Sequence, residues 1–350
     1  MNKLKKKKEK STPTCIGTGL VALDVIMNGS PKTPSKIFAG GSCGNVMSIL
    51  SYLSWESYPI ARLKKDNAAK ELLSDLQKWK VKINMISITE DGSTPIIIQR
   101  IKKDKNGLPI HRFEFKNPDD GSWLPRYKPV LSADVESIVQ KNVAPKVFYF
   151  DRINRASIDF AKYYKSKGAI VYFEPSSIGE MRLFEECLNV ADVIKFSSDR
   201  ISNYSTLFPK QRVSLEIETF GKNGVKFRFS HKLDQKSWSA VPANQVDTFY
   251  DAAGAGDWTS AGIITKLGKT GLKGFNSLKK DTVISAIKYG QSLGSLNCFF
   301  DGARGMMYNL SKKEVDRLVT AIQKSKKPFN INVKIKAQTN KRELKIGSLY

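Results

Sequence analysis

The feature that most constrains the fold of this chain is an alternation of short apolar runs with amphipathic segments. Residues 58–63 and 81–88 are apolar runs typical of strands, and residues 66–79 between them have the spacing of a helix capped by Asp66. The apolar stripe of this helix consists of Ala69, Leu72, Leu73, Leu76 and Trp79. The same order of elements returns over residues 146–173. Strand–helix–strand order predicts a parallel sheet with right-handed crossovers, and therefore an α/β fold.

The composition fits one large α/β domain or two small ones. Of the 350 residues 41% are hydrophobic, which is enough for a sizeable core. The four cysteines are scattered without C-x-x-C spacing, which argues against a disulfide scaffold or a zinc site and fits a reducing cytosol. No apolar run reaches the roughly 18 residues of a membrane span. No apolar region follows the lysine-rich start, so no secretory signal is expected. We expect a cytoplasmic protein with no membrane partner.

The net charge of +25 is concentrated at the two ends of the chain. Six lysines and one glutamate give residues 1–10 a charge of +5, and seven lysines, one arginine and one glutamate give residues 321–350 a charge of +7. We therefore expect a folded domain over residues 13–325, a disordered basic tail over residues 1–12 and a solvated basic segment over residues 326–350. The sequence shows no aromatic–basic module, so nucleic acid is not an expected partner.

The strongest chemical signal is the stretch Asp251–Asp257, with the sequence DAAGAGD, which precedes an apolar helical run. Gly254 and Gly256 let a ligand approach the backbone, and the N–H groups of the first helical turn favour a phosphate oxygen. The Asp257 carboxylate would repel that phosphate unless it removes a proton from an attacking hydroxyl. On the residues alone, a glycine loop with an aspartate in the first helical turn is the favoured interpretation, because a short glycine pattern is weak evidence by itself.

A second glycine motif lies about two hundred residues upstream, at Gly40-Gly41-Ser42-Cys43-Gly44-Asn45-Val46. Together the two motifs resemble the G-G-x-x-x-N-V and D-T-x-G-A-G-D signatures of the ribokinase-like sugar kinases, also called the phosphofructokinase B family. The resemblance covers residues 13–325. It implies a three-layer α/β/α sandwich with a mostly parallel central sheet and a small β lid formed by residues 28–40 and 93–116. A hairpin with Asn106-Gly107 in its connection is predicted for the second part of that lid.

The resemblance also implies roles for residues on the acceptor side. Asp257 would be the general base, and the backbone of Gly254, Ala255 and Gly256 would complete an anion hole with it. The sugar would be bound by Asp24, Gly40, Gly41, Asn45, Arg100, Asp151 and Glu174. Asp24 is predicted near the end of a strand over residues 14–26, and Asp151 and Glu174 each follow a predicted strand, at the sheet edge where ligands gather. Arg100 and Arg112 on the hairpin belong either to a solvated strand face or to the recognition of a substrate carboxylate or phosphate.

On the nucleotide side, the resemblance implies ATP binding and two cations. The ATP ligands would be Lys195, Ser197, Thr219, Gly221, Gly224 and Asn297. Residues 191–200 resemble a strand exit that ends in an acidic residue which organises Mg²⁺, but Arg200 stands at that position and Asp199 is the candidate Mg²⁺ ligand. Asp251, together with residues 302–305, is the candidate site of a monovalent cation such as K⁺.

The predicted function is ATP-dependent phosphorylation of a sugar hydroxyl by a kinase that forms a homodimer through its lid. Two alternatives remain open. A nucleoside kinase of the same fold would need ring-stacking aromatic residues in the acceptor site, and residues 40–45 offer none. A non-catalytic scaffold or sensor is favoured by Arg200 and by Ser176, which stands where the family often has asparagine. The complete DAAGAGD stretch argues against a scaffold.

Overall fold

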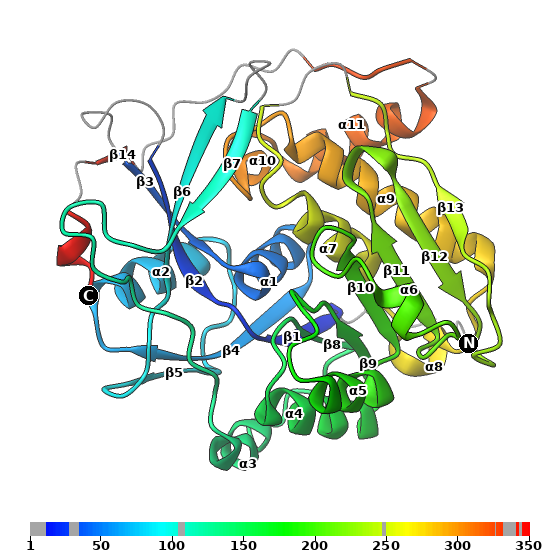
Figure 1. Ribbon diagram of the computed structural model, residues 1–350, viewed down its shortest axis with the longest axis horizontal. Helices are drawn as coiled ribbons and strands as arrows, with labels where there is room; N and C mark the ends of the chain where they lie inside the picture. Colours follow the sequence, from blue (N-terminus) through cyan, green and yellow to red (C-terminus); the bar gives the residue numbers. More distant parts are fainter. Residues whose placement is uncertain are drawn as a thin grey trace, which may run out of the picture.

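The computed structural model describes residues 12–27, 35–103, 109–246, 250–325, 327–331, 341–342 and 345–350. In these residues nine strands form a large sheet in the order β13-β12-β11-β10-β9-β8-β1-β4-β5 (Figure 1). The strands are β1 (Thr14–Thr18), β4 (Glu56–Lys64), β5 (Ile86–Thr89), β8 (Val147–Phe150), β9 (Ile170–Phe173), β10 (Val193–Ser197), β11 (Leu215–Thr219), β12 (Val225–Phe229) and β13 (Ser239–Val241). Within it β12 pairs antiparallel with both β11 and β13, and the other six pairs are parallel, so the sheet is mostly parallel, as predicted.

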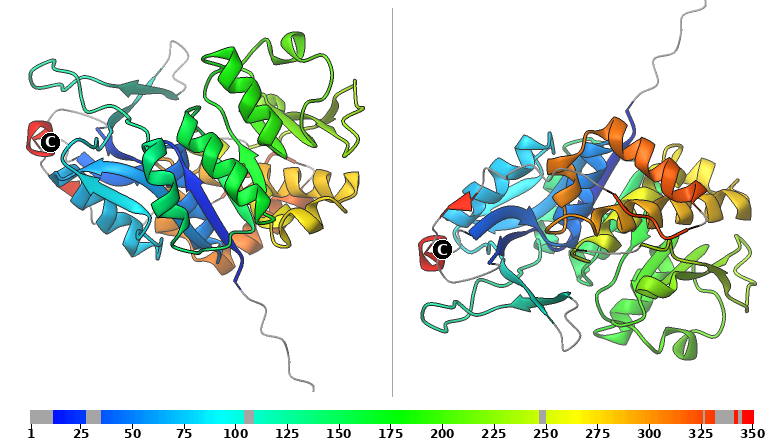
Figure 2. Two further views of the ribbon diagram at one scale, coloured as in Figure 1. Left: turned by 90° about the horizontal axis from the view of Figure 1, so that it is seen from below. Right: turned by 90° about the horizontal axis from the view of Figure 1, so that it is seen from above.

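Helices cover both faces of the large sheet and make the predicted three layers (Figure 2). One face packs against α1 (Ser42–Tyr52), α2 (Asn67–Lys78), α7 (Ala255–Leu267), α9 (Lys280–Asn297) and α11 (Lys312–Lys324). The other face packs against α3 (Val135–Val139), α4 (Arg155–Ser166) and α5 (Met181–Val190). The shorter helices are α6 (Tyr204–Leu207), α8 (Gly271–Phe275) and α10 (Gly305–Asn309). Asp66 caps α2 as predicted, since its carboxylate accepts the N–H of Ala69 at 2.7 Å. None of the described helices has the length and apolar character that a membrane crossing requires.

A second, smaller sheet stands at one side of the large sheet, in the strand order β14-β3-β2-β6-β7. Its strands are β2 (Ala22–Ile26), β3 (Ser35–Gly40), β6 (Ile96–Lys103), β7 (Pro109–Glu114) and β14 (Lys341–Arg342). It contains the predicted hairpin, because β6 and β7 pair antiparallel. The predicted connection at Asn106-Gly107 and the lid residues 28–34 lie outside the described residues.

The prediction of one strand over residues 14–26 was wrong. The chain turns at Gly19, whose φ is 135°, and a Cβ there would lie 1.6 Å from Oδ1 of Asp151. Because of this turn, β1 joins the large sheet and β2 joins the small one. Asp24 therefore lies in the middle of a strand of the small sheet and not at the edge of the large one.

The prediction of a solvated C-terminal segment was wrong for the last six residues. Ile346 and Leu349 are buried in the core that also contains α2. The carbonyl of Leu349 accepts the N–H of Ala68 at 2.8 Å. The prediction rested on the charge of the segment and took no account of these two apolar side chains. Their burial holds the end of the chain against the domain.

Candidate functional site

The turn before α7 has a conformation that requires glycine. Gly254 is left-handed, with φ 71°, and a Cβ on it would lie 2.2 Å from the carbonyl oxygen of Ala303. The indole Nε1 of the buried Trp258 donates to that same oxygen at 3.1 Å. The start of α7 is thus packed directly on the loop of residues 301–305. The N–H of Ala255 donates to the carbonyl of Ala252 at 3.3 Å, and the N–H groups that follow it lie at the helix N-terminus.

Two buried polar side chains hold the turn and this loop together. The carboxylate of Asp251 accepts the N–H of Ala253 at 2.9 Å and the N–H of Gly302 at 2.8 Å. The amide of Asn297 donates to the carbonyls of Ala253 at 3.0 Å and Gly302 at 3.3 Å, and it accepts the N–H of Met306 at 3.2 Å. Both side chains are buried, and they bond the turn to residues 302–306. Their predicted roles, with a monovalent cation for Asp251 and with the nucleotide for Asn297, stay predictions.

Asp257 and Asn45, predicted from motifs far apart in the sequence, lie side by side. The amide Nδ2 of Asn45 donates to Oδ2 of Asp257 at 2.8 Å. Gly41 precedes α1 with φ 75°, and a Cβ there would lie 2.4 Å from the carbonyl oxygen of Leu20, so this turn also requires glycine. Gly40 and Gly41 thereby bring the start of α1, which carries Asn45, to the start of α7.

The environment of Asp257 raises the pKa of its carboxyl group to about 7. Burial is the largest cause, and the negative charge of Glu174 adds to it. The hydrogen bond from Asn45 and the positive charges of Lys195 and Arg200 act in the opposite direction. A carboxylate that titrates near neutral pH can accept a proton from a hydroxyl and release it again, as a general base must.

Lys195 and Glu174 form an ion pair beneath the first turn of α7. The Nζ of Lys195 contacts Oε1 of Glu174 and also donates to the carbonyl of Gly256 at 3.1 Å. Glu174 is fixed further by the hydroxyls of Tyr149 at 3.2 Å and of Ser260. In the structure the predicted ATP ligand Lys195 and the predicted sugar ligand Glu174 therefore contact each other.

The other predicted ATP ligands, Ser197, Thr219, Gly221 and Gly224, lie at or just after the ends of β10 and β11. Ser197 and Thr219 are register partners at these strand ends, and the hydroxyl of Thr219 donates to the carbonyl of Phe196 at 3.3 Å. Gly221 and Gly224 follow in the turn between β11 and β12, with φ 52° and 94°. The open backbone of such a turn allows close approach of a ligand.

The turn after β10 carries Asp199 and Arg200, both exposed. The N–H of Asp199 donates to the hydroxyl of Ser197 at 3.3 Å. In the described part of the chain, no three His, Cys, Asp or Glu side chains are grouped to hold a metal ion. A metal ion at this turn would therefore take most of its ligands from phosphate oxygens and water, which is the usual manner of Mg²⁺.

The predicted acceptor residues lie in different surroundings. The Asp24 carboxylate lies directly over Gly40, where a Cβ would come within 2.0 Å of it. Asp151 is buried, accepts the N–H of Leu20 at 2.9 Å and pairs with Arg152 at 2.7 Å. Burial raises the pKa of Asp151 against the opposing effect of Arg152. Arg100 pairs with Glu114 across the hairpin at 2.8 Å, and Arg112 is exposed.

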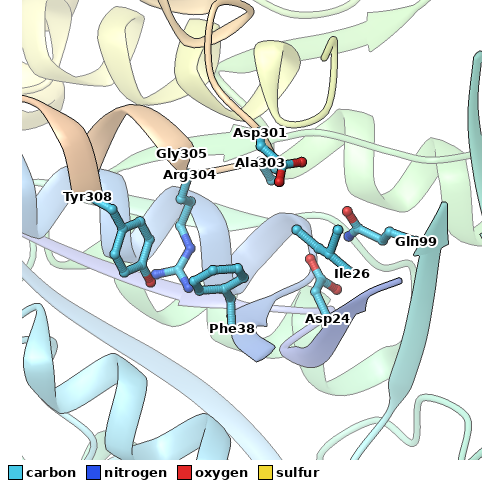
Figure 3. A pocket seen from close by; sticks show the side chains of 10 residues that line it. Asp24, Ile26, Phe38, Gln99, Asp301, Ala303, Arg304, Gly305 and Tyr308 are labelled. Atoms are coloured by element: carbon cyan, nitrogen blue, oxygen red, sulfur yellow. The ribbon is translucent and has the colours of Figure 1, made fainter. Parts of the chain in front are cut away.

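Residues that the sequence did not single out line a narrow recess beside Asp24 (Figure 3). Gln99 and Phe38 reach it from the small sheet, and Arg304 and Tyr308 reach it from the segment after α9. Residues 302–305 were predicted only as part of a monovalent-cation site, and no sequence pattern indicates that Arg304 is buried against strands more than 250 residues earlier.

Comparison with protein-family models decides the family. The model described as "pfkB family carbohydrate kinase" matches residues 31–308. The chain belongs to the pfkB family of carbohydrate kinases. This result confirms the resemblance drawn from the two glycine motifs. A comparison with curated proteins finds no match.

Solved structures share the fold of this pfkB-family protein. A fructokinase with bound ATP from Xylella fastidiosa has a TM-score of 0.69 at 16% identity, covering 89% of this chain and 99% of its own. An aminoimidazole riboside kinase from Salmonella enterica has a TM-score of 0.64 at 16% identity, covering 87% and 99%. A nucleoside kinase from Methanocaldococcus jannaschii has a TM-score of 0.62 at 16% identity, covering 89% and 99%. These similarities confirm the ribokinase-like fold.

Proposed function

We propose that this protein transfers the γ-phosphoryl group of ATP to a hydroxyl group of a sugar, with Asp257 as general base. The observation that carries the proposal is the carboxylate of Asp257 in the first turn of α7, bonded to Asn45 and with a pKa raised to about 7. A carboxyl group with a pKa near neutral pH is a stronger base than an ordinary carboxylate, and it is ionised at slightly alkaline pH.

In the proposed reaction, the sugar hydroxyl gives its proton to Asp257 while its oxygen bonds to the γ-phosphorus. The bond between the γ-phosphorus and the oxygen that bridges it to the β-phosphorus breaks, and ADP leaves with that oxygen. The N–H groups of Gly256 and Asp257 stabilise the charge on the γ-phosphoryl oxygens, and that of Ala255 joins them when it exchanges its bond to the carbonyl of Ala252 for one to phosphate. Asn45 orients the carboxylate, and the Lys195–Glu174 pair supports the turn from below through the carbonyl of Gly256.

The proposed cofactors are ATP and Mg²⁺, with a monovalent cation such as K⁺ near the turn. ATP would lie over the ends of β10 and β11, where Ser197, Thr219, Gly221 and Gly224 gather. Mg²⁺ bound to the phosphates would neutralise their charge, and Asp199 is the protein carboxylate at that side of the site. Asp251 is the buried acid that would face a monovalent cation.

The proposal is tested by following ADP formation with ATP, Mg²⁺ and a panel of sugars, for the wild type and Asp257→Asn. The wild type is expected to phosphorylate at least one sugar, and Asp257→Asn to lose roughly 10²–10⁴-fold in kcat. Asp316→Asn, on the exposed side of α11, is the matched control and should keep full activity. Equal activity of Asp257→Asn and wild type would overturn the role of the base, and failure to bind ATP would favour a scaffold.

A nucleoside acceptor is the second candidate, since two of the structural neighbours are named as a riboside kinase and a nucleoside kinase. Nucleosides therefore belong in the same panel. A preference for them by kcat/KM over every sugar would replace the proposed substrate while leaving the proposed chemistry intact.

We also propose that the lid mediates a homodimer. Phe113, near the end of β7, and Phe115, directly after β7, are 49% and 50% exposed, and Trp123 in the following loop is 58% exposed. Exposed aromatic groups of this kind are typical of protein interfaces. Sedimentation analysis should give twice the 39.2 kDa of one chain, and Trp123→Ser should shift the equilibrium toward the monomer.

A further inference from the structure

Two charged side chains that the sequence assigned to different substrates lie together beneath the α7 turn. Glu174, directly after β9, was predicted to bind the sugar, and Lys195, in β10, was predicted to bind ATP. The Oε1 atom of Glu174 contacts the Nζ atom of Lys195, and the two side chains are only 14% and 3% exposed. The predicted ligands of two substrates are thus bonded to each other.

The carboxylate of Glu174 has donors on both of its oxygens. Oε1 contacts Lys195, and Oε2 accepts the hydroxyl of Tyr149 at 3.2 Å and the hydroxyl of Ser260. Because these donors belong to β10, β8 and α7, three elements of the core hold the carboxylate. A carboxylate accepts about four hydrogen bonds. Little capacity therefore remains for a sugar hydroxyl.

The ammonium group of Lys195 is committed in the same way. It contacts Glu174 and donates to the carbonyl of Gly256, the second residue of α7, at 3.1 Å. Helix carbonyls point away from the N-terminal end, whereas a phosphate is expected at that end. Lys195 thus lies on the side of the turn away from the phosphate. To reach ATP it would have to leave Glu174 largely buried and unpaired, which is costly.

Both charges act on Asp257, the residue that follows Gly256. The negative charge of Glu174 raises the pKa of the Asp257 carboxyl group, and the positive charge of Lys195 lowers it. Burial is the largest cause of the raised value of about 7, and the exposed Arg200 acts in the same direction as Lys195. The pair beneath the turn therefore has two members with opposite effects on the proposed base.

Three other ionisable side chains belong to the same cluster. Tyr149 of β8 and Cys43 of α1 are buried, and burial raises the pKa of both groups well above neutral pH, so both stay uncharged there. Asp151, directly after β8, is paired with Arg152 at 2.7 Å. The charges with the largest effects on Asp257 are accordingly those of Glu174, Lys195 and Arg200.

We propose that Glu174 and Lys195 bind neither the sugar nor ATP, and that they are positioning residues which hold the α7 turn and set the pH range in which Asp257 works as the base. The proposal rests on the proposed kinase function. Glu174 opposes the ionisation of Asp257, so the carboxylate, once ionised, takes a proton from a hydroxyl more readily. Lys195 limits this effect and fixes the backbone of Gly256, whose N–H faces the γ-phosphoryl group in the proposed reaction.

The test is the pH dependence of kcat/KM in variants that remove one charge or both. Glu174→Gln removes the negative charge and leaves Lys195 without its counter-charge. Both changes favour ionised Asp257, so the midpoint near pH 7 should move to lower pH by about one pH unit or more. Lys195→Met has the opposite effect on charge and should move the midpoint to higher pH.

The double variant Glu174→Gln/Lys195→Met keeps the test decisive even if Lys195→Met does not fold. It buries no unpaired charge, so its midpoint should return from that of Glu174→Gln toward the wild-type value. A role in packing alone would not move the midpoint in two directions. A double variant with a midpoint no higher than that of Glu174→Gln would overturn the role of Lys195.

Asp192→Asn is the matched control. Asp192, directly before β10, is also a largely buried carboxylate paired with a lysine, Lys165, at 2.9 Å, but it is not among the charges with the largest effects on Asp257. The control should keep the wild-type midpoint. An unchanged midpoint in Glu174→Gln, or an equal shift in Asp192→Asn, would overturn the proposal.

The Michaelis constants distinguish positioning from ligand binding. The proposal predicts that KM for the sugar in Glu174→Gln and KM for ATP in the double variant both stay close to the wild-type values, while kcat falls because a weaker base remains. If Glu174 bound the sugar, Glu174→Gln would instead raise KM for the sugar at an unchanged midpoint. That result, or a raised KM for ATP in the double variant, would restore the predicted ligand roles and overturn the proposal.

A measurement without turnover separates failure of this inference from failure of the kinase function. If no acceptor is phosphorylated, the kinase function fails, and NMR of protein labelled at the aspartate carboxyl groups then follows the titration of Asp257. Its signal is the one that is missing in Asp257→Asn. A lower midpoint of this signal in Glu174→Gln than in the wild type would support the effect of Glu174 on Asp257, and equal midpoints would overturn it.

Discussion

The turn that begins α7 and the turn that follows β10 meet near Lys195, but the first is fixed by buried polar groups whereas the second carries exposed charged side chains. At the α7 turn, Asp251 and Asn297 bond to backbone groups on both sides, and Gly254 leaves no room for a side chain. At the β10 turn, Asp199 and Arg200 are exposed. A substitution in the first turn changes the structure, whereas one in the second changes mainly the charge near the phosphates.

The difference between these two turns explains why the sequence indicates the α7 turn more clearly than the β10 turn. Backbone constraints at the α7 turn tolerate few residues, so its short motif, taken together with the one at Gly40-Gly41, indicates it. Exposed side chains at the β10 turn are not constrained by packing, and there an arginine stands where the family pattern has an acid.

The largest effect is expected from Lys195→Met, which removes one partner of the ion pair beneath the α7 turn. Glu174 would remain largely buried without its cation, and such a loss lowers the free energy of unfolding by about 3–5 kcal/mol. Urea denaturation measures the change. Arg155→Met breaks the exposed pair with Glu186 and is the control, with a far smaller expected change. Similar losses of unfolding free energy in the two variants would mean that the Lys195–Glu174 pair does not stabilise the α7 turn.

A smaller effect is expected from Gly254→Ala. Its Cβ would clash with the carbonyl of Ala303, in addition to the roughly 1–2 kcal/mol that a left-handed conformation costs a non-glycine residue. Gly221→Ala, in the turn between β11 and β12, is the matched control because its φ is 52° and no atom lies within 4 Å of the added Cβ. Thermal unfolding should show the larger destabilisation for Gly254→Ala, and an equal change in both proteins would contradict the tight packing of the α7 turn.

The smallest effect is expected from Arg200→Ala. The positive charge of Arg200 lowers the pKa of Asp257, so removing it should raise that pKa by less than about one pH unit. Fewer Asp257 groups are then ionised below neutral pH, so the pH–rate profile should move to higher pH. Arg200→Glu should move it further in the same direction. Lys210→Ala, at another exposed cation, is the control, and a shift to lower pH in either Arg200 variant would contradict the effect.

Much of the fold could be predicted because local periodicity and burial agree. The helix predicted over residues 66–79 and the strand predicted over residues 58–63 have regular patterns, and the structure places α2 and β4 there. The break at Gly19 could not be predicted, because the apolar residues on both sides continue the same pattern while they enter different sheets. Gly19 is required by Asp151, a contact that appears only when β8 lies beside β1.

Some residues of the candidate site could likewise be predicted from the sequence, and others could not. Asn45 and Asp257 could be predicted since each belongs to a short glycine motif, and they prove to be hydrogen-bonded to each other. The positions of Arg304 and Gln99 in the recess could not, because they depend on the packing of segments about 200 residues apart in the sequence. The pairing of Arg100 with Glu114 across the hairpin likewise depends on the strand register, which the sequence does not reveal.

The pH dependence of kcat/KM in the wild type and in Asp257→Asn tests the central claim most directly. Only the deprotonated carboxylate accepts a proton, so the wild-type value should fall about tenfold for each pH unit below a midpoint near 7, the raised pKa of Asp257, and level off above it. Asp257→Asn should be roughly 10²–10⁴-fold slower and lack this midpoint. A variant that retains both the rate and the midpoint near pH 7 would contradict the assignment of Asp257 as the general base.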